Sequence, residues 1–418
     1  MDKKTLVVVG GGAAGFFCAI TAASLYPQLQ VIIVEKSNKL LAKVKVSGGG
    51  RCNVTNACFS IAAMIKNYPR GAAFLKKAFH HFFTTDTIKW FEERGVKLKT
   101  EADGRVFPVT NSSQTIVDCL IKEANKYNVQ ILLNAEVKGI EYNNKKFHLQ
   151  FTNSRIQISD YLCIATGGYP KSEQFNWLKQ LGHSIEEPVP SLFTFNLPNS
   201  DITKLMGVSV ENASVKIVGS KLFSTGPLLI THWGFSGPAV LKLSALAARD
   251  LQKTNYRFEV AVNWLPAFNE NTFKEKMQEL RFQLAAQKII NRNPFALPQR
   301  LWDYLLLSSG IEAEKRWADL TTAQENRLIK NCCTFVFTVS GKTTFKEEFV
   351  TCGGIKLSEI DASTLQSNIV PGLFFAGEVL DIDGVTGGFN FQNAWTTGFI
   401  AGKSISNFQY ATFTKKAN

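Results

Sequence analysis

Residues 5–35 read TLVVVGGGAAGFFCAITAASLYPQLQVIIVE. Residues 5–9 and 31–34 are short β-branched runs, which is typical of buried strands. Between them lies a GxGxxG cluster at residues 10–15, and then a stretch apolar on every side that predicts a buried helix to about Leu25. Strand, glycine-rich turn, helix, second strand and terminal acid together predict a Rossmann-type dinucleotide-binding unit in an α/β fold.

Each part of this motif has a physical task. Gly10 makes the tight turn, Gly12 lets the backbone approach a pyrophosphate, and Gly15 lets helix and strand pack closely. The first N–H groups of the helix and its dipole favour phosphate. Glu35 follows Gly15 by 20 residues, where a carboxylate can bind both ribose hydroxyls and disfavours a 2′-phosphate.

The uncharged run Thr5–Tyr26 could also be read as a membrane anchor. Its glycines divide it into a strand and a buried helix, so we expect no membrane segment. The eight cysteines form neither CxxC nor CxxxxC, and the five histidines form no evident metal cluster. Reduced, scattered thiols indicate the cytoplasm and argue against a dithiol flavoprotein or a cysteine-based zinc site.

Further glycine-containing segments occur along the chain. Residues 47–53 read SGGGRCN and predict a loop whose backbone N–H groups could contact a cofactor. Residues 161–168 form an apolar run ending in Thr-Gly-Gly, and residues 373–378 form another ending in Gly-Glu. Residues 383–402 then predict a glycine-rich loop that enters an apolar helix near Asn393. A helix beginning after such a loop suits the flavin end of FAD, where its dipole favours an anionic reduced ring.

Together these motifs resemble one family closely. The segments GGGAAG, SGGGRCNVTN, DGRVFPVTN, ATGGYP, THWGFSGP, TCGGI and GEVLDIDGVTGGFNFQNAWTTG occur in order over nearly the whole chain. They resemble the BaiN/aminoacetone-oxidase-like bacterial flavoproteins, which are generally labelled NAD(P)/FAD-dependent oxidoreductases. The resemblance implies FAD, a glutathione-reductase-like FAD domain, and an inserted β-barrel plus helical module. It does not fix the substrate.

The resemblance also implies which residues surround the cofactor. The expected cofactor-binding residues are Gly10, Gly12, Ala13, Ala14, Gly15, Glu35, Lys36, Ser47, Gly48, Gly49, Gly50, Arg51, Cys52, Asn53, Val137, Thr166, Gly167, Gly377, Glu378, Gly388, Phe389, Asn390, Gln392 and Asn393.

Cofactor motifs at both ends of the chain predict a discontinuous FAD domain, with everything between them inserted. We expect the FAD domain to comprise residues 1–190 and 345–418, and a β-rich insert to comprise 191–265 and 332–344. Residues 266–331 should form a helical insert. Residues 270–330 hold 10 Lys and Arg against 8 Asp and Glu, which is typical of a solvated helical surface. Strands are expected at 193–197, 214–218, 257–262, 335–339 and 345–350.

The candidate catalytic residues lie in the insert and in the glycine-rich segment at residues 47–53. The turn at 231–238 should display His232, Trp233 and Phe235 as an aromatic surface over the flavin, with His232 as general acid. The alternative is an ordinary turn. Arg51 is a second catalytic candidate. Cys52 beside it is either an activated thiolate or, as we favour, a packed loop residue.

The sequence therefore predicts an FAD-dependent oxidoreductase. NAD(P)H should act as a transient donor, because there is no second GxGxxG, and the acceptor should be a flat or apolar molecule, a conjugated enone included, or oxygen. The alternative is a flavin-containing RNA-modifying or RNA-binding protein, because the formal charge is +13 and residues 1–100 contribute +10. The lack of paired cysteines and of a basic tail favours the first. Oligomeric state stays open.

Overall fold

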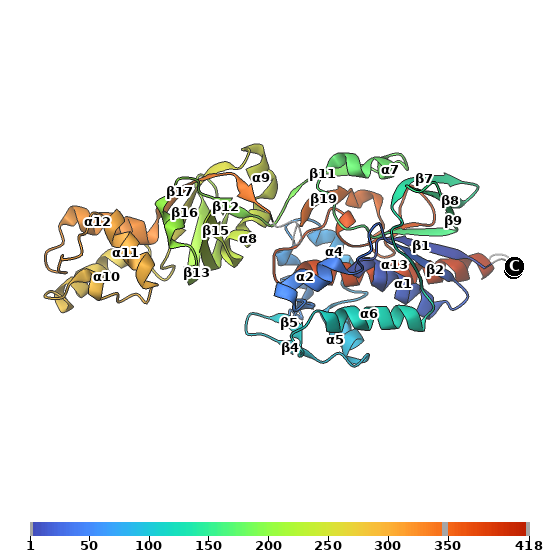
Figure 1. The fold of residues 1–418 in the computed structure, drawn as a ribbon, viewed down its shortest axis with the longest axis horizontal. Coiled ribbons are helices and arrows are strands. Elements are labelled where there is room, and N and C mark those ends of the chain that lie inside the picture. The colour runs from blue at the N-terminus through green and yellow to red at the C-terminus, as the bar shows by residue number, and fades with distance from the viewer. Residues whose placement is uncertain (1–2, 345–349, 415–418) are drawn as a thin grey trace. The chain divides into compact units, whose positions relative to one another are not determined.

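The computed structural model describes residues 3–344 and 350–414, with side-chain surroundings through residue 405 (Figure 1). The chain divides into two compact units, one of residues 1–191 with 346–418 and one of residues 192–345. The first unit is therefore discontinuous in sequence.

The first unit is built on a parallel sheet of five strands in the order β20-β10-β1-β2-β6. The glycine-rich turn, the helix and the second strand stand in the predicted order, and β1 pairs in register with both β2 and β10. The apolar run at residues 161–168 provides the inner strand β10, and the run at 373–378 provides the edge strand β20. The bounds are β1 Thr5–Val9, β2 Gln30–Val34, β6 Gln130–Leu132, β10 Tyr161–Ile164 and β20 Leu373–Phe375.

Two helices from opposite ends of the chain, α1 (Ala13–Leu25) and α13 (Phe389–Thr414), lie side by side in this unit. A Cβ at Gly398 would come within 2.5 Å of the Ala14 carbonyl oxygen, so only glycine permits this approach. The first turn of α1 packs equally closely against the preceding glycine-rich turn, since a Cβ at Gly15 would lie 1.9 Å from the Gly10 carbonyl oxygen. This agrees with the packing role expected of Gly15.

Smaller elements surround the sheet. The helices are α2 Ala42–Gly50, α3 Ile61–Met64, η1 Ile65–Asn67, α4 Ala72–Ala78, α5 Thr84–Glu92, α6 Gln114–Lys126, η2 Ser172–Phe175, α7 Asn176–Lys179, η5 Leu357–Glu359 and η6 Gly377–Val379. The additional strands are β3 Thr55–Asn56, β4 Leu98–Thr100, β5 Arg105–Pro108, β7 Val137–Asn143, β8 Lys146–Phe151, β9 Ile156–Ser159, β11 Ile185–Pro190 and β19 Thr351–Ile355. No helix of the described residues is both long and apolar enough to cross a membrane.

The second unit contains a sheet of seven strands in the order β17-β16-β13-β14-β15-β12-β18. Gly341 alone separates β17 from β18. One continuous segment therefore pairs with β16 at one edge and with β12 at the other, which closes the sheet into the expected barrel. The strands are β12 Thr194–Asn196, β13 Ser209–Ile217, β14 Phe223–Thr231, β15 Gly234–Ser236, β16 Arg257–Asn263, β17 Phe335–Ser340 and β18 Lys342–Thr343.

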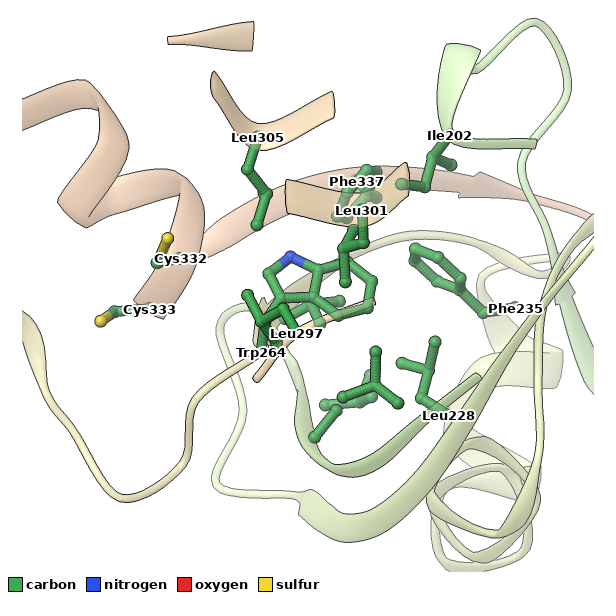
Figure 2. Close-up of a cluster of buried hydrophobic side chains, with 14 of the residues drawn as sticks. Ile202, Leu228, Phe235, Trp264, Leu297, Leu301, Leu305, Cys332, Cys333 and Phe337 are labelled. Carbon is green, nitrogen blue, oxygen red and sulfur yellow. The ribbon is translucent and has the colours of Figure 1, made fainter. Parts of the chain in front are cut away.

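The helices of this unit share one hydrophobic core with the barrel. Figure 2 shows Trp264 among side chains of the barrel, such as Phe235, and of α11, such as Leu301. Cys332 and Cys333 are buried at the end of α12. The helices are η3 Asp201–Leu205, α8 Pro238–Leu246, α9 Ala248–Lys253, α10 Glu270–Gln283, η4 Ile289–Asn291, α11 Gln299–Ser308 and α12 Thr322–Cys333.

Two expected elements differ from the structure. The terminal helix begins at Phe389, one turn before the expected start near Asn393, because it follows directly on Gly387 and Gly388. The expected strand at 345–350 falls almost entirely outside the described residues, and the described strand β19 begins at Thr351.

Candidate flavin site

The N-terminus of α1 has the form of an anion-binding site. Gly12 is its N-cap and has extended backbone, and no side chain caps the helix. The first turn holds no acidic residue. A Cβ at Gly12 would meet no atom within 4 Å, so space is open where a phosphate would approach the N–H groups of Ala13 and Ala14. Gly10 has a φ of 116°, and a Cβ there would lie 2.3 Å from the Ala165 carbonyl oxygen.

Glu35 lies at the carboxyl end of β2 and is fixed by three hydrogen bonds. Its Oε2 accepts from the Gly11 N–H at 2.9 Å, and its Oε1 accepts from the Ser37 N–H at 3.0 Å and the Ser37 hydroxyl at 2.9 Å. The carboxylate is thereby bound to the glycine-rich loop. A carboxylate has about four acceptor sites, so capacity remains for a ribose hydroxyl. The neighbouring Lys36 is exposed.

The segment expected to be a loop at residues 47–53 is in fact the end of helix α2 and the turn after it. Ser47 has an extended ψ of 150°, and Gly48 and Gly49 adopt left-handed conformations, so the helix is kinked there. A Cβ at Gly49 or at Gly50 would meet no atom within 4 Å. Open space therefore lies beside Gly49 and Gly50 at the kink.

The residues that follow the kink are held in place by other parts of the first unit. Arg51 forms an ion pair with Glu101 at 2.6 Å, and its guanidinium lies 4.0 Å from the centre of the Phe107 ring. Cys52 is fully buried, and burial raises the pKa of its thiol to about 12. The activated-thiolate alternative for Cys52 is therefore wrong, and the packed-residue interpretation holds. Asn53 donates to the Thr55 carbonyl and accepts from the N–H of Gly388, both at 2.9 Å.

Residues near the C-terminus lie against the N-terminal motif. A Cβ at Gly377 would come within 2.9 Å of the Ala14 Cβ, so Gly377 lies against the first turn of α1. Its N–H donates to the Thr397 hydroxyl at 2.8 Å. Glu378 accepts from the Thr351 N–H at 2.8 Å and forms an ion pair with Lys43 at 2.7 Å.

The N-terminus of α13 joins the same region through Gly388 and Asn53. Asn390 bonds both the N–H and the carbonyl of Gly384, which closes the preceding loop. Gln392 is fully buried, and its amide group bonds Thr55, Thr87 and Thr396, so its side chain is used within the fold. The Oδ1 of buried Asn393 has no hydrogen-bond partner among the described residues, which suits a group that a ligand would complete.

The remaining predicted residues are scattered more widely over the first unit. Thr166 and the left-handed Gly167 lie just after β10, at the carboxyl end of the sheet where ligands bind in open α/β folds. Val137 begins β7 and is half-buried, and Phe389 is buried and accepts a hydrogen bond from the Tyr68 hydroxyl at 2.6 Å. The open glycines, uncapped α1 and unpaired Asn393 oxygen together fit a bound dinucleotide.

One buried ion pair of the first unit was not expected from the sequence. Arg70 forms a two-bond ion pair with Asp383, and both residues also contact the hydroxyl of Ser191. Asp383 is fully buried, and this burial raises the pKa of its carboxyl although the Arg70 guanidinium opposes the change. The network fixes the start of the loop 383–388 to Ser191, the last residue of the first unit before the insert.

In the second unit the turn at 231–238 differs from the expected display of three aromatic residues. His232 is exposed between β14 and β15, and its ring lies edge-on to Trp233 with centroids 4.2 Å apart. Phe235 is fully buried in the core instead, because it is the inward-facing residue of β15. The expectation for Phe235 is therefore wrong.

Comparison with known proteins identifies the family. The family described as HI0933-like protein Rossmann domain matches residues 4–404. The chain belongs to this family. The match confirms the resemblance drawn from the motifs, and it makes the protein a member of an FAD-dependent oxidoreductase family with a Rossmann-type FAD domain.

Two curated relatives are similar over their full length. A ribosomal RNA dihydrouridine synthase of Haemophilus influenzae is 31% identical, with 96% of this chain and 98% of the relative covered. A 3-dehydro-bile acid delta(4,6)-reductase of Clostridium scindens is 26% identical, with 96% and 98% covered. The family therefore includes proteins named for different substrates.

A solved structure supports the fold. The 3-ketosteroid-delta4-(5alpha)-dehydrogenase of Rhodococcus jostii superposes with a TM-score of 0.51 at 11% identity, covering 97% of this chain and 98% of that one. At this identity the similarity shows the fold alone.

Proposed function

We propose that this protein reduces a carbon–carbon double bond conjugated with a carbonyl group, using electrons that NADH or NADPH delivers to FAD. The observation that carries the proposal is the chemistry shared by the two relatives' names. Dihydrouridine is uridine with the double bond next to a ring carbonyl saturated, and the Δ4 and Δ6 bonds of a 3-dehydro-bile acid are conjugated with its 3-oxo group. Two unrelated substrates thus offer the same kind of bond.

Residues at the start of α1, Glu35 and residues at the start of α13 would hold the cofactor. The N–H groups at the start of α1 would face the pyrophosphate, and Glu35 would accept from the ribose hydroxyls. The first turn of α13 would turn its N–H groups and positive dipole end toward the flavin ring. Bound FAD supplies hydride transfer between a nicotinamide and such an acceptor.

Saturation of the double bond also requires a proton at the α-carbon of the acceptor, and we assign this role to His232. Its imidazole is exposed on a hairpin turn beside the Trp233 ring. Imidazole is the side chain best suited to proton transfer near neutral pH, and an adjacent aromatic ring suits a flat apolar substrate. Arg51 is less suited, because its guanidinium is occupied by Glu101 and Phe107.

Anaerobic stopped-flow measurement of the two half-reactions tests the proposal. NADH or NADPH should bleach the flavin absorbance, and a 3-oxo-Δ4 steroid should restore it. His232→Asn should leave the first step unchanged and slow the second by at least about tenfold. His80→Asn, which changes an exposed histidine of the first unit, is the matched control. Failure of both nucleotides to bleach the flavin contradicts the donor, and failure of every conjugated acceptor contradicts the reaction class.

A uracil base in ribosomal RNA is a second candidate acceptor. It is favoured by the dihydrouridine synthase relative, which is 31% identical over nearly the whole chain, and by the +10 charge of residues 1–100. Adding unmodified ribosomal RNA to the reduced protein separates the two candidates. Reoxidation by RNA and by no small enone would show that the expectation of a small flat substrate is wrong.

A further inference from the structure

Two charged residues that are 335 positions apart form an ion pair near the glycine-rich turn at residues 10–15. Lys43 of α2 places its Nζ 2.7 Å from Oε2 of Glu378 in η6. The Lys43 side chain is 48% exposed, whereas that of Glu378 is only 16% exposed. Lys43 was not among the cofactor residues expected from the sequence, and the pair joins a segment near each end of the chain.

Glu378 lies in a segment that contacts the candidate pyrophosphate site. The preceding residue, Gly377, lies against the first turn of α1 at Ala14. Oε1 of Glu378 accepts from the Thr351 N–H at 2.8 Å, and a Cβ at Gly168 would come within 2.9 Å of the same oxygen. The carboxylate is therefore fixed. A fixed, poorly solvated carboxylate repels a nearby diphosphate unless a cation compensates its charge.

The glycine-rich turn at residues 10–15 also holds the start of α2, which carries Lys43. Two residues before it, the Leu41 N–H donates to the Gly11 carbonyl at 2.8 Å, and α2 begins directly after this contact. The start of α2 is thus tied to the turn that precedes α1. Lys43 is consequently placed to compensate a charge beside that turn.

We propose that Lys43 is a positioning residue for the FAD diphosphate, and that it acts through Glu378. Its ammonium neutralises the carboxylate, so that Glu378 can remain in the site without repelling the diphosphate. An ion pair with one exposed partner contributes little to folding stability, so its effect should be found in cofactor affinity. The inference concerns FAD binding only and is independent of the electron donor and acceptor.

A double-mutant cycle on FAD affinity tests this proposal. Apoprotein is titrated with FAD, and in parallel with ADP, for the wild type, Lys43→Met, Glu378→Gln and the double variant. Lys43→Met should weaken binding of both ligands by about tenfold, and Lys43→Arg should restore it. After Glu378→Gln, the same lysine change should weaken binding by less than about threefold, because no carboxylate charge remains to compensate.

Lys45→Met is the matched control, because it removes an equal charge from an exposed lysine of the same helix. It should change either affinity by less than about threefold. Titration with ADP keeps the cycle readable if Glu378→Gln weakens contacts at the flavin end. Equal weakening by Lys43→Met in both backgrounds would show that Lys43 acts on the diphosphate directly, and would overturn the proposal. No weakening in the wild-type background would overturn it as well.

Discussion

At the scale of single residues, a substitution at Gly12 tests whether the start of α1 binds an anion. A Cβ at Gly12 meets no atom within 4 Å, and aspartate is a favourable N-cap, so Gly12→Asp should fold normally. Its carboxylate would occupy the N–H groups that a diphosphate needs. We expect purified Gly12→Asp to lack flavin absorbance, while the melting temperature of its apoprotein equals or exceeds that of wild-type apoprotein.

The control for this prediction adds the same charge at another helix start. Asn269 caps α10 in the second unit through its side-chain oxygen, and aspartate can replace it there. Asn269→Asp should retain flavin in full. Gly12→Asp protein that carried FAD at the wild-type ratio would show that this loop is not the cofactor site.

The residues that sequence analysis placed correctly are those with local tasks. Gly10 and Gly15 are required by the geometry of one turn, and that geometry follows from the motif itself. The error at Phe235 concerns a residue whose surroundings come from distant parts of the chain. Its burial depends on the pairing of β15, so it could not be inferred from neighbouring residues.

At the scale of elements, a buried histidine joins three segments of the first unit. His183 Nδ1 lies 3.1 Å from Glu359, and its Nε2 lies 2.9 Å from the Ser367 hydroxyl. That hydroxyl already accepts the N–H groups of Ile369 and Val370, so its own proton must be donated to Nε2. Nε2 is therefore unprotonated, and a neutral imidazole connects the segments around β11 and η5.

This arrangement predicts a dependence of stability on pH. Burial lowers the pKa of His183 from its ordinary value of 6.5, an effect that Glu359 partly opposes. The unfolded chain binds this proton more readily than the folded protein, so the neutral His183 stabilises the fold above pH 6.5. This contribution to the free energy of unfolding declines as the pH falls below 6.5. The decline from one proton is at most about 1.4 kcal/mol per pH unit.

Chemical denaturation at a series of pH values from about 7.5 to about 5 measures this decline in the free energy of unfolding. His183→Gln should flatten the decline, whereas His80→Gln, which changes an exposed histidine, should keep the wild-type slope. An unchanged slope in His183→Gln would show that another group causes the pH dependence.

The inner strands of the parallel sheet could be predicted from their apolar runs, because buried parallel strands have a distinct composition. Helix α2 could not, since its last turn contains three glycines and ends in left-handed conformations. The barrel was expected from the family resemblance alone. Its closure depends on one segment, β17 with β18, that pairs at both edges of the sheet, and no local pattern reveals such long-range pairing.

At the scale of the whole molecule, one compact unit is formed from both ends of the chain. Strand β20 and helix α13 come from the C-terminal part, yet β20 extends the N-terminal sheet and α13 packs against α1. The candidate cofactor residues therefore converge in one unit although they are separated by the entire insert. We infer from this convergence a single FAD site built from both ends of the sequence.

Flavin analysis of the purified protein tests this claim most directly. The protein is denatured by heat, and the released flavin is identified by chromatography and counted against protein concentration. We expect FAD, fully released and close to one molecule per chain, because the glycine-rich turn before α1 and Glu35 suit the ADP part of FAD and we expect no covalent attachment. Protein that contains FMN, that keeps its flavin after denaturation, or that binds no flavin when FAD is supplied would contradict it.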